Sequence, residues 1–261
     1  MTIAITREVS SRFNECEITH IDRVPIDVKT ARAEHHEYTG VLKRLGCQVI
    51  ELPEEPELPD SVFVEDTAFI LDEVAVITRP GADSRKAETE SIIQALSPYR
   101  ELVHITEPAT VDGGDVLVLG KNIYVGISTR SNNEAIHQMQ ELLNKYGYKI
   151  TAVNMHDCLH LKTAVTKVDE NTLLINPKWV DNFHFKDFDW IEVDASEPLA
   201  ANCLPIGDSI IYPKAFPKTQ NKLEQKGYRI ESVKVSELAK AEGAVTCCSL
   251  IISQQTESSL S

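Results

Sequence analysis

The sequence lacks any apolar run long enough to span a membrane, and its opening residues, MTIAITREVSSRF, lack the apolar core of a secretion signal. Basic residues are scarce, with 26 Lys and Arg against 40 Asp and Glu, which gives a formal net charge of −14. Such a charge repels nucleic acid and anionic membranes and attracts small cations, although an acidic balance also serves solubility alone. We therefore expect a cytoplasmic protein with no nucleic-acid or membrane partner.

Cysteines are present, but no C-x-x-C spacing occurs among them. Six cysteines in a chain of 261 residues without a secretion signal do not suggest a disulfide framework. One pair is unusual, because Cys247 and Cys248 are adjacent within the apolar stretch AVTCCSLII, residues 244–252, which predicts a strand. Two neighbouring thiols in such a stretch need a chemical explanation.

One pattern recurs along the chain: a strand, a polar turn, a second strand, a helix and a short third strand. Corresponding positions, Asp66, Asp115, Thr163, Asn202 and Cys247, lie 49, 48, 39 and 45 residues apart. This period is typical of propellers and repeat arrays.

The helices of these units are predicted with unequal clarity. The first copy predicts a helix over residues 84–96, the second a helix that begins with Ser131 as part of a capping box, and the fourth a helix over residues 218–226. The third copy is too aromatic and irregular for a helix to be predicted.

The two ends of the chain together would supply a fifth unit. Residues 28–46 have helical spacing, and the missing opening strand would be residues 244–252. Five such units could form an α+β sandwich or a closed ring. A ring would bring the start of every unit to one axis, where chemistry could be concentrated.

Polar side chains gather near the predicted strand starts. A thiolate can attack an electrophile, a histidine can move protons near neutral pH, and carboxylates can hold a cation. Taken singly, each has an ordinary explanation: a core histidine, a DGGD turn with glycines at positive φ, or solvated charges. Because these side chains occupy corresponding positions in successive units, together they predict nucleophilic attack on a cationic substrate. The set comprises Asp60, Glu65, Asp66, Asp112, Asp115, His160, Asn202, Cys247 and Cys248.

Seven segments carry a family resemblance: PDSVFVEDTAFI, ITRPGADSR, TVDGGDVLVLG, GISTRSNNE, LHLKT, AANC and VTCCSLII, in this order. Together they closely resemble the dimethylarginine dimethylaminohydrolases, which belong to the guanidine-modifying, or pentein, superfamily. The resemblance implies a five-bladed α/β propeller of pseudo-symmetric ββαβ units, closed by the C-terminal strand. It implies one catalytic domain over residues 1–254 and a disordered tail over residues 255–261.

The resemblance also implies an activity: hydrolysis of Nω-methylated arginines to citrulline and methylamines through a covalent cysteine intermediate, without a cofactor. Cys247 would be the nucleophile and His160 the general acid and base. The implied substrate-binding residues are Asp66 and Asp112 for the guanidinium, Arg85 and Arg130 for the α-carboxylate, and Asp60 with the main-chain carbonyl of Ile18 for the α-amine. Glu65, Asp115 and Asn202 would support them.

Several alternatives stay open at this stage. An arginine deiminase or another amidinohydrolase of the superfamily would use the same parts, and a thiol sensor or zinc-binding protein could use Cys247, Cys248 and His160. Zinc could also inhibit an enzyme by capturing Cys247 and His160. A bound guanidinium would favour the thiolate, so we expect a neutral Cys247 thiol in the free protein. Either a monomer or a homodimer fits the sequence.

Overall fold

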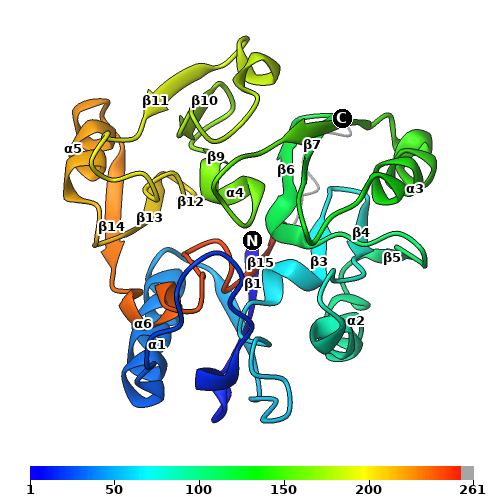
Figure 1. Ribbon diagram of the computed structural model, residues 1–261, viewed down its shortest axis with the longest axis horizontal. Coiled ribbons are helices and arrows are strands. Elements are labelled where there is room, and N and C mark those ends of the chain that lie inside the picture. Colours follow the sequence, from blue (N-terminus) through cyan, green and yellow to red (C-terminus); the bar gives the residue numbers. More distant parts are fainter. Residues whose placement is uncertain (254–261) are drawn as a thin grey trace.

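In the computed structural model, which describes residues 1–253, the strands form five three-stranded sheets arranged in a ring (Figure 1). In each sheet the first two strands are antiparallel and the third runs parallel to the second. The sheets are β3 (Ala68–Ile70), β4 (Val74–Ile77) and β5 (Glu101–His104); β6 (Val116–Leu119), β7 (Asn122–Ile127) and β8 (Lys149–Asn154); β9 (Val165–Lys167), β10 (Thr172–Ile175) and β11 (Asp189–Glu192); β12 (Leu204–Ile206), β13 (Ser209–Pro213) and β14 (Arg229–Val233); and β15 (Leu250–Ser253), β1 (Thr2–Arg7) and β2 (Gln48–Leu52).

A helical segment joins the second strand of each sheet to the third and lies toward the outside of the ring (Figure 1). Such a crossover is what a parallel strand pair requires. The segments are α1 (Val28–Arg44), η3 (Asp83–Glu88) with α2 (Thr89–Leu96), α3 (Asn133–Leu143) with η5 (Asn144–Tyr146), η6 (Asn182–Phe185), and α5 (Pro217–Gln225). Shorter helices are η1 (Phe13–Glu15), η2 (Val64–Thr67), η4 (Gly113–Asp115), α4 (Leu161–Ala164) and α6 (Ser236–Ala239).

The ends of the chain close the ring, as predicted. Strand β15 pairs antiparallel with β1, with Ile3 opposite Ile252, and β1 pairs parallel with β2. The prediction of one strand over residues 244–252 is wrong, because the strand begins only at Leu250 and the two cysteines lie in the preceding turn. There the carbonyl of Cys247 accepts a hydrogen bond from the Glu65 amide instead of joining a sheet ladder.

Five buried apolar clusters hold the ring together, each formed by two consecutive units. In one of them, Tyr38 and Leu42 of α1 share a cluster with Ile211 of β13 and Val233 of β14. No unit therefore encloses a core of its own, and each covers its apolar surface against its neighbours.

The helix predictions are partly confirmed. Helix α5 agrees with the predicted residues 218–226 to within one residue at each end. The first unit has a 3-10 segment before α2 in place of one α-helix, and the third unit has only the short η6. In the second unit the cap is Asn132 and not Ser131, whose hydroxyl donates to the Asp115 carboxylate.

Within residues 1–253, no helix has the length and apolar character needed to cross a bilayer. All six cysteines are free thiols. The predicted disordered tail, residues 255–261, lies outside the described part of the chain.

Candidate active site

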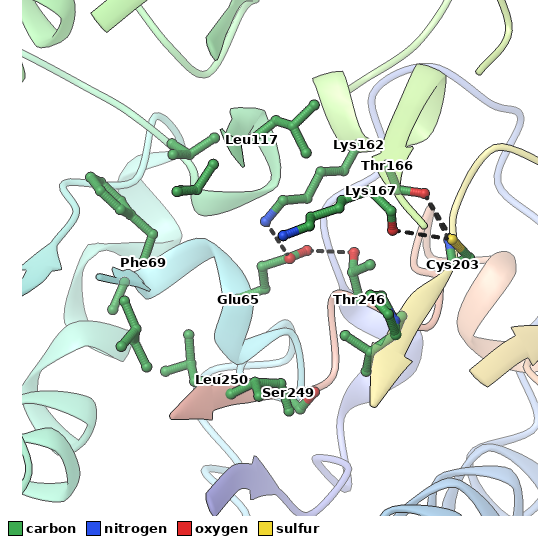
Figure 2. A pocket seen from close by; sticks show the side chains of 17 residues that line it. Glu65, Phe69, Leu117, Lys162, Thr166, Lys167, Cys203, Thr246, Ser249 and Leu250 are labelled. Carbon is green, nitrogen blue, oxygen red and sulfur yellow. Dashed lines mark hydrogen bonds and ion pairs between the residues drawn. The ribbon is translucent and has the colours of Figure 1, made fainter. Parts of the chain in front are cut away.

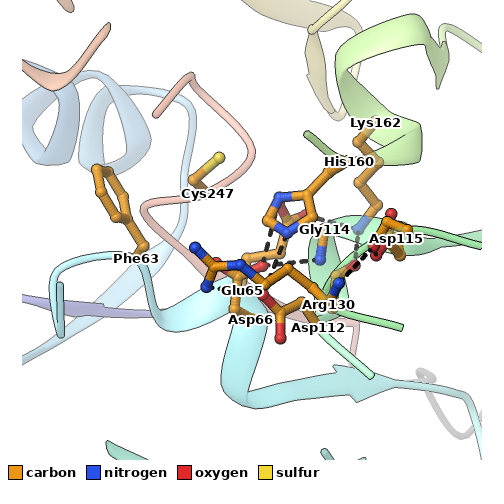
Figure 3. A network of polar contacts seen from close by, with 12 residues as sticks. Phe63, Glu65, Asp66, Asp112, Gly114, Asp115, Arg130, His160, Lys162 and Cys247 are labelled. Atoms are coloured by element: carbon orange, nitrogen blue, oxygen red, sulfur yellow. Dashed lines mark hydrogen bonds and ion pairs between the residues drawn. The ribbon is translucent and has the colours of Figure 1, made fainter. Parts of the chain in front are cut away.

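The segments that lead into the inner strands converge at the ring axis. Asp66 lies in η2 before β3, Asp112 precedes η4 and β6, His160 precedes α4 and β9, and Cys247 precedes β15. Figure 3 shows these side chains facing a common space, with the Cys247 sulfur turned toward the side of the His160 ring. Sequence positions up to 181 residues apart are therefore joined in one site, as the repeat predicted.

His160 lies between two carboxylates. Its Nε2 is 3.2 Å from Asp112 Oδ2, and its Nδ1 is 3.9 Å from Asp66 Oδ1. Burial alone would lower the pKa of His160, but the charges of Asp66 and Asp115 and the contact with Asp112 raise it to about 9. The imidazole is thus a protonated cation near neutral pH and carries a proton that it can donate.

Asp66 and Asp112 are fixed in place by further hydrogen-bond donors. Asp66 Oδ1 accepts from the Gly114 amide at 2.9 Å, and Asp66 Oδ2 accepts from Arg85 at 2.6 Å. Asp112 Oδ1 accepts from the Gly81 amide at 2.8 Å. Although burial opposes it, the charges of His160 and Arg85 lower the pKa of Asp66, which keeps that carboxylate ionised. Two anchored carboxylates beside one histidine form a receptor for a planar cation.

The glycines of the DGGD stretch allow this close approach. Neither adopts a positive φ, so a glycine-dependent turn conformation does not explain them. A Cβ on Gly113 would lie 1.9 Å from the Glu65 carbonyl oxygen, and a Cβ on Gly114 would lie 2.6 Å from His160 Nδ1 and 2.9 Å from Asp66 Oδ1. Both positions must lack a side chain because the site is packed against them.

This packing yields a prediction for Gly114→Ala. The added methyl group displaces His160 and Asp66, and a displacement of about 1 Å at such a site costs roughly 10²-fold in turnover. Gly40→Ala in α1 is the control, since its Cβ would approach only the Arg44 side chain, at 3.6 Å. Steady-state kinetics of both variants would contradict this account if Gly114→Ala matched Gly40→Ala.

Cys247 is only half-buried, whereas Cys248 is buried. The Ala244 amide donates to Cys247 Sγ at 3.4 Å, and Cys248 Sγ lies 3.7 Å from the Ala244 carbonyl. Burial and the negative charges of Glu65 and Asp66 raise the pKa of Cys247 above its usual range. The free protein therefore holds Cys247 as a neutral thiol.

Arg85 is buried and heavily bonded. Its guanidinium donates to Glu88 from Nε and Nη2, to Asp66 from Nη1, and to the main-chain oxygens of Asp60 and Phe63. Burial raises the pKa of Glu88 to about 7 against the opposing effect of Arg85. These contacts leave little of the guanidinium free for another partner.

Arg130 has more open donors. Its Nη2 donates to the Thr19 hydroxyl at 2.9 Å, and its Nη1 is 3.8 Å from Asp112 Oδ2. Asp60 accepts the Glu17 amide at 3.0 Å, and burial raises the pKa of Asp60. Both side chains thus contact the N-terminal segment that contains Ile18.

Glu17 of this segment lines the pocket together with Glu242. Glu242, a non-glycine residue with φ of 60°, accepts the Thr19 amide at 2.8 Å and the His20 amide at 2.6 Å. The enclosed space is only about 20 Å³, which is far below the roughly 300 Å³ of a typical small ligand pocket. The pocket must therefore widen before a molecule of arginine size can enter.

The three residues predicted as supports are all buried at the axis. Asp115 accepts the hydroxyls of Ser128 and Ser131, both at 2.6 Å, and the Leu161 amide at 3.0 Å, which ties α4 to η4. Burial raises the pKa of Asp115 to about 6. Glu65 and Asn202 both bond to the side chain of Thr246, the residue before Cys247.

Asp66, Asp112 and His160 could also act as metal ligands, with donor atoms all within 4.8 Å of one another. However, His160 Nε2 is engaged by Asp112, and the ring is protonated on both nitrogens near neutral pH. Cys247 is not part of this group. Inhibitory zinc at Cys247 and His160 stays a prediction.

The residues of the site that were not singled out from the sequence include Lys162, Glu88, Thr246 and Glu242. Lys162 and Thr246 occupy the same phase of the repeat as the predicted residues, which is the signal that could have revealed them. Glu88 stands three residues after Arg85, a spacing that pairs opposite charges on a helix, whereas Glu242 contacts a distant segment and carries no such signal.

Comparison with known proteins agrees with this geometry. A family model described as "N,N dimethylarginine dimethylhydrolase, eukaryotic" matches residues 11–253. The chain belongs to the dimethylarginine dimethylaminohydrolase family. It is 37% identical over 226 residues to the N(G),N(G)-dimethylarginine dimethylaminohydrolase of Pseudomonas aeruginosa, covering 86% of this chain and 89% of that one. It is 34% identical over 250 residues to the protein of the same name in Streptomyces coelicolor, covering 95% of each.

Solved structures of this family superpose closely on the chain. A cysteine-to-serine mutant of the Pseudomonas aeruginosa enzyme, complexed with citrulline, has a TM-score of 0.89 at 33% identity and covers 95% of this chain and 98% of its own. A histidine-to-glycine variant of a dimethylarginine dimethylaminohydrolase, as the adduct with S-methyl-L-thiocitrulline, has a TM-score of 0.92 at 34% identity and covers 97% and 100%. The five-sheet ring is therefore the propeller fold of this family.

Proposed function

We propose that this protein hydrolyses Nω-methylated arginines to citrulline and methylamine or dimethylamine. The observation that carries the proposal is the pair of anchored carboxylates, Asp66 and Asp112, beside a protonated histidine and a half-buried thiol. A guanidinium bound by both carboxylates would present the flat face of its central carbon to Cys247. The related enzymes crystallised with citrulline and with a thiocitrulline adduct support the same substrate class.

In the first half of the reaction, the guanidinium cation favours loss of the Cys247 proton to solvent. The thiolate forms a carbon–sulfur bond with the central guanidinium carbon. His160 donates its proton to the methylated nitrogen, the carbon–nitrogen bond breaks, and the amine leaves. A cationic S-alkylthiouronium remains on Cys247.

In the second half, neutral His160 takes a proton from a water molecule, which attacks the same carbon. The carbon–sulfur bond breaks, the hydroxyl proton of the adduct passes through water to the departing Cys247 sulfur, and citrulline is released with the neutral thiol restored. Asp66 and Asp112 stabilise the imidazolium that is restored. The cycle uses side chains of this chain and water alone.

For the amino-acid end of the substrate, Arg130 is the principal candidate ligand of the α-carboxylate. The one hydrogen bond of its guanidinium among the described residues goes to the neutral hydroxyl of Thr19, and Asp112 lies 3.8 Å away, so a carboxylate could replace Thr19 with stronger bonds. Arg85 would contribute at most a secondary contact, since Glu88 and Asp66 occupy most of its donors. The Asp60 carboxylate and the carbonyl of Ile18 are proposed to receive the α-amine.

The site is proposed to work in the cytoplasm, on a small-molecule substrate, in a monomer or a homodimer. The six free thiols support a reducing compartment.

The test is citrulline release from asymmetric dimethylarginine, monomethylarginine and arginine, each supplied separately. We expect citrulline and the matching amine from the two methylated compounds. Citrulline mainly from arginine would make the protein a deiminase, and no citrulline from any of the three would overturn the proposal in favour of a thiol sensor.

A further inference from the structure

A cluster of hydrogen-bonded polar groups at the ring axis contacts the turn that contains Cys247. We define the axial cluster as the side chains of Glu65, Lys162, Asn202 and Thr246 together with the Gly113 carbonyl. Each member comes from a different unit and lies in the segment before its first strand. Glu65 precedes β3, Gly113 precedes β6, Lys162 precedes β9, Asn202 precedes β12, and Thr246 precedes β15. The cluster thus joins all five units through polar contacts.

The contacts form a continuous network. Lys162 Nζ donates to Glu65 Oε1 at 2.6 Å and to the Gly113 carbonyl at 3.2 Å. The Thr246 hydroxyl donates to Glu65 Oε2 at 2.7 Å and accepts from Asn202 Nδ2 at 3.0 Å. Asn202 Nδ2 also donates to the Lys162 carbonyl at 3.1 Å.

The orientation of this network is determined by its chemistry. The Thr246 amide can only donate, and it donates to Asn202 Oδ1 at 3.1 Å, so the other end of the Asn202 side chain must be the NH₂ group. That NH₂ group can only donate to Thr246 Oγ1, and the hydroxyl must therefore donate to Glu65. Both side-chain polar atoms of Asn202 and both carboxylate oxygens of Glu65 are used.

The same network holds the nucleophile's backbone. Thr246 is fixed through both its amide and its hydroxyl, and the carbonyl of Cys247 accepts from the Glu65 amide at 3.1 Å. Three bonds within two consecutive residues leave the Cys247 turn little freedom. Buried networks with all members satisfied rigidify their surroundings.

The cluster also separates two cavities. Glu65, Lys162 and Thr246 line a larger cavity of about 210 Å³ whose other walls are mostly apolar (Figure 2). None of the three lines the smaller pocket that contains Cys247 and His160. The Lys162 ammonium group also lies next to Glu65, which directly precedes Asp66 of the proposed guanidinium site.

We propose that the axial cluster positions Cys247. In this arrangement Thr246 fixes the direction of the thiol, and Lys162 neutralises the charge of Glu65 near the thiol. This inference rests on the proposed function. Without Thr246 the turn loses its support, and without Lys162 an uncompensated carboxylate near the sulfur disfavours the thiolate.

The first test compares Thr246→Val with Thr246→Ser in the full-length protein. We expect Thr246→Val to lower kcat by roughly 10-fold to 100-fold with KM changed by less than about threefold, since alignment and not binding is lost. Thr246→Ser keeps the hydroxyl and should restore kcat. Thr219→Val is the matched control, because Thr219 is also buried and its hydroxyl accepts one bond, from the Asp194 amide.

The second test measures alkylation of Cys247 by chloroacetamide, quantified by peptide mass spectrometry, which needs no turnover. Lys162→Met should slow alkylation at pH 8 by about tenfold, the equivalent of a rise of about one unit in the apparent thiol pKa. The double variant Lys162→Met with Glu65→Gln removes both charges and should return the rate toward that of the wild type.

Wild-type kcat in Thr246→Val, no rescue by Thr246→Ser, or an unchanged alkylation rate in Lys162→Met would each overturn the positioning role. A merely structural role predicts lower thermal stability with none of these kinetic changes and no rescue by the second charge substitution. If the wild type released no citrulline, the proposed function would fail, whereas the alkylation results would still decide the role of the cluster.

Discussion

Cys247→Ser is expected to lose citrulline formation by roughly 10⁴-fold or more, because a serine hydroxyl at this position has no adjacent neutral base to ionise it. His160, the only nearby proton acceptor proposed, is already protonated near neutral pH. Binding of the substrate should persist, since the two carboxylates that hold the guanidinium are untouched. Activity assays and calorimetric titration with asymmetric dimethylarginine would measure the two effects separately.

Cys248→Ala is the matched control for this variant. The Cys248 thiol is buried, and burial raises its pKa well above the usual range, so it is a packing residue in this account. We expect it to retain turnover with a small loss of thermal stability. Loss of activity in Cys248→Ala with retention in Cys247→Ser would move the nucleophile to the neighbouring residue and contradict the mechanism.

Asp112→Asn is the second change with a large expected effect. The carboxylate contacts His160 Nε2 at 3.2 Å and faces the proposed guanidinium site. Its replacement removes a negative charge that raises the pKa of His160, so a smaller fraction of His160 carries the proton needed by the leaving amine, and the cationic substrate binds less well. We expect kcat/KM to fall roughly 10²-fold to 10³-fold, with both kcat and KM affected.

Asp194→Asn provides the control for charge removal alone. Asp194 accepts the Ser196 amide at 3.0 Å in an exposed turn and belongs to no part of the site. Its variant should have wild-type kinetics in the same assay. Equal kinetics for Asp112→Asn and Asp194→Asn would show that Asp112 has no part in the reaction.

The repeat made the ring predictable from the sequence, since corresponding positions 39 to 49 residues apart fall one to three residues before the starts of β3, β6, β9, β12 and β15. Strand β1 was missed as the centre of the closing sheet because its partners, β15 and β2, are remote from one another in sequence. The extent of the final strand was also missed. An apolar pattern cannot distinguish a ladder residue from one whose carbonyl bonds to a distant amide, as that of Cys247 does.

The candidate site was predictable only where chemistry and repeat phase coincided. The thiol, the histidine and the carboxylates were found in this way, whereas the engagement of Arg85 by Asp66 and by the Phe63 carbonyl depends on tertiary geometry. The DGGD glycines show the same limit. Their residue type suggested a turn, but contacts with Glu65 and His160 explain them, and such contacts exist only after the units have assembled.

The central claim is that Cys247 stays a neutral thiol until a cation binds, and the pH dependence of its alkylation in the free protein tests this most directly. Because burial and the charges of Glu65 and Asp66 raise the folded-state pKa, the rate should still be rising above about pH 8.5, the ordinary pKa of a thiol. Chloroacetamide incorporation at Cys247, resolved from Cys248 by peptide mass spectrometry, gives this profile. A continuous rise through the neutral range is the predicted result, and a plateau near neutral pH would reveal a standing thiolate and contradict the account.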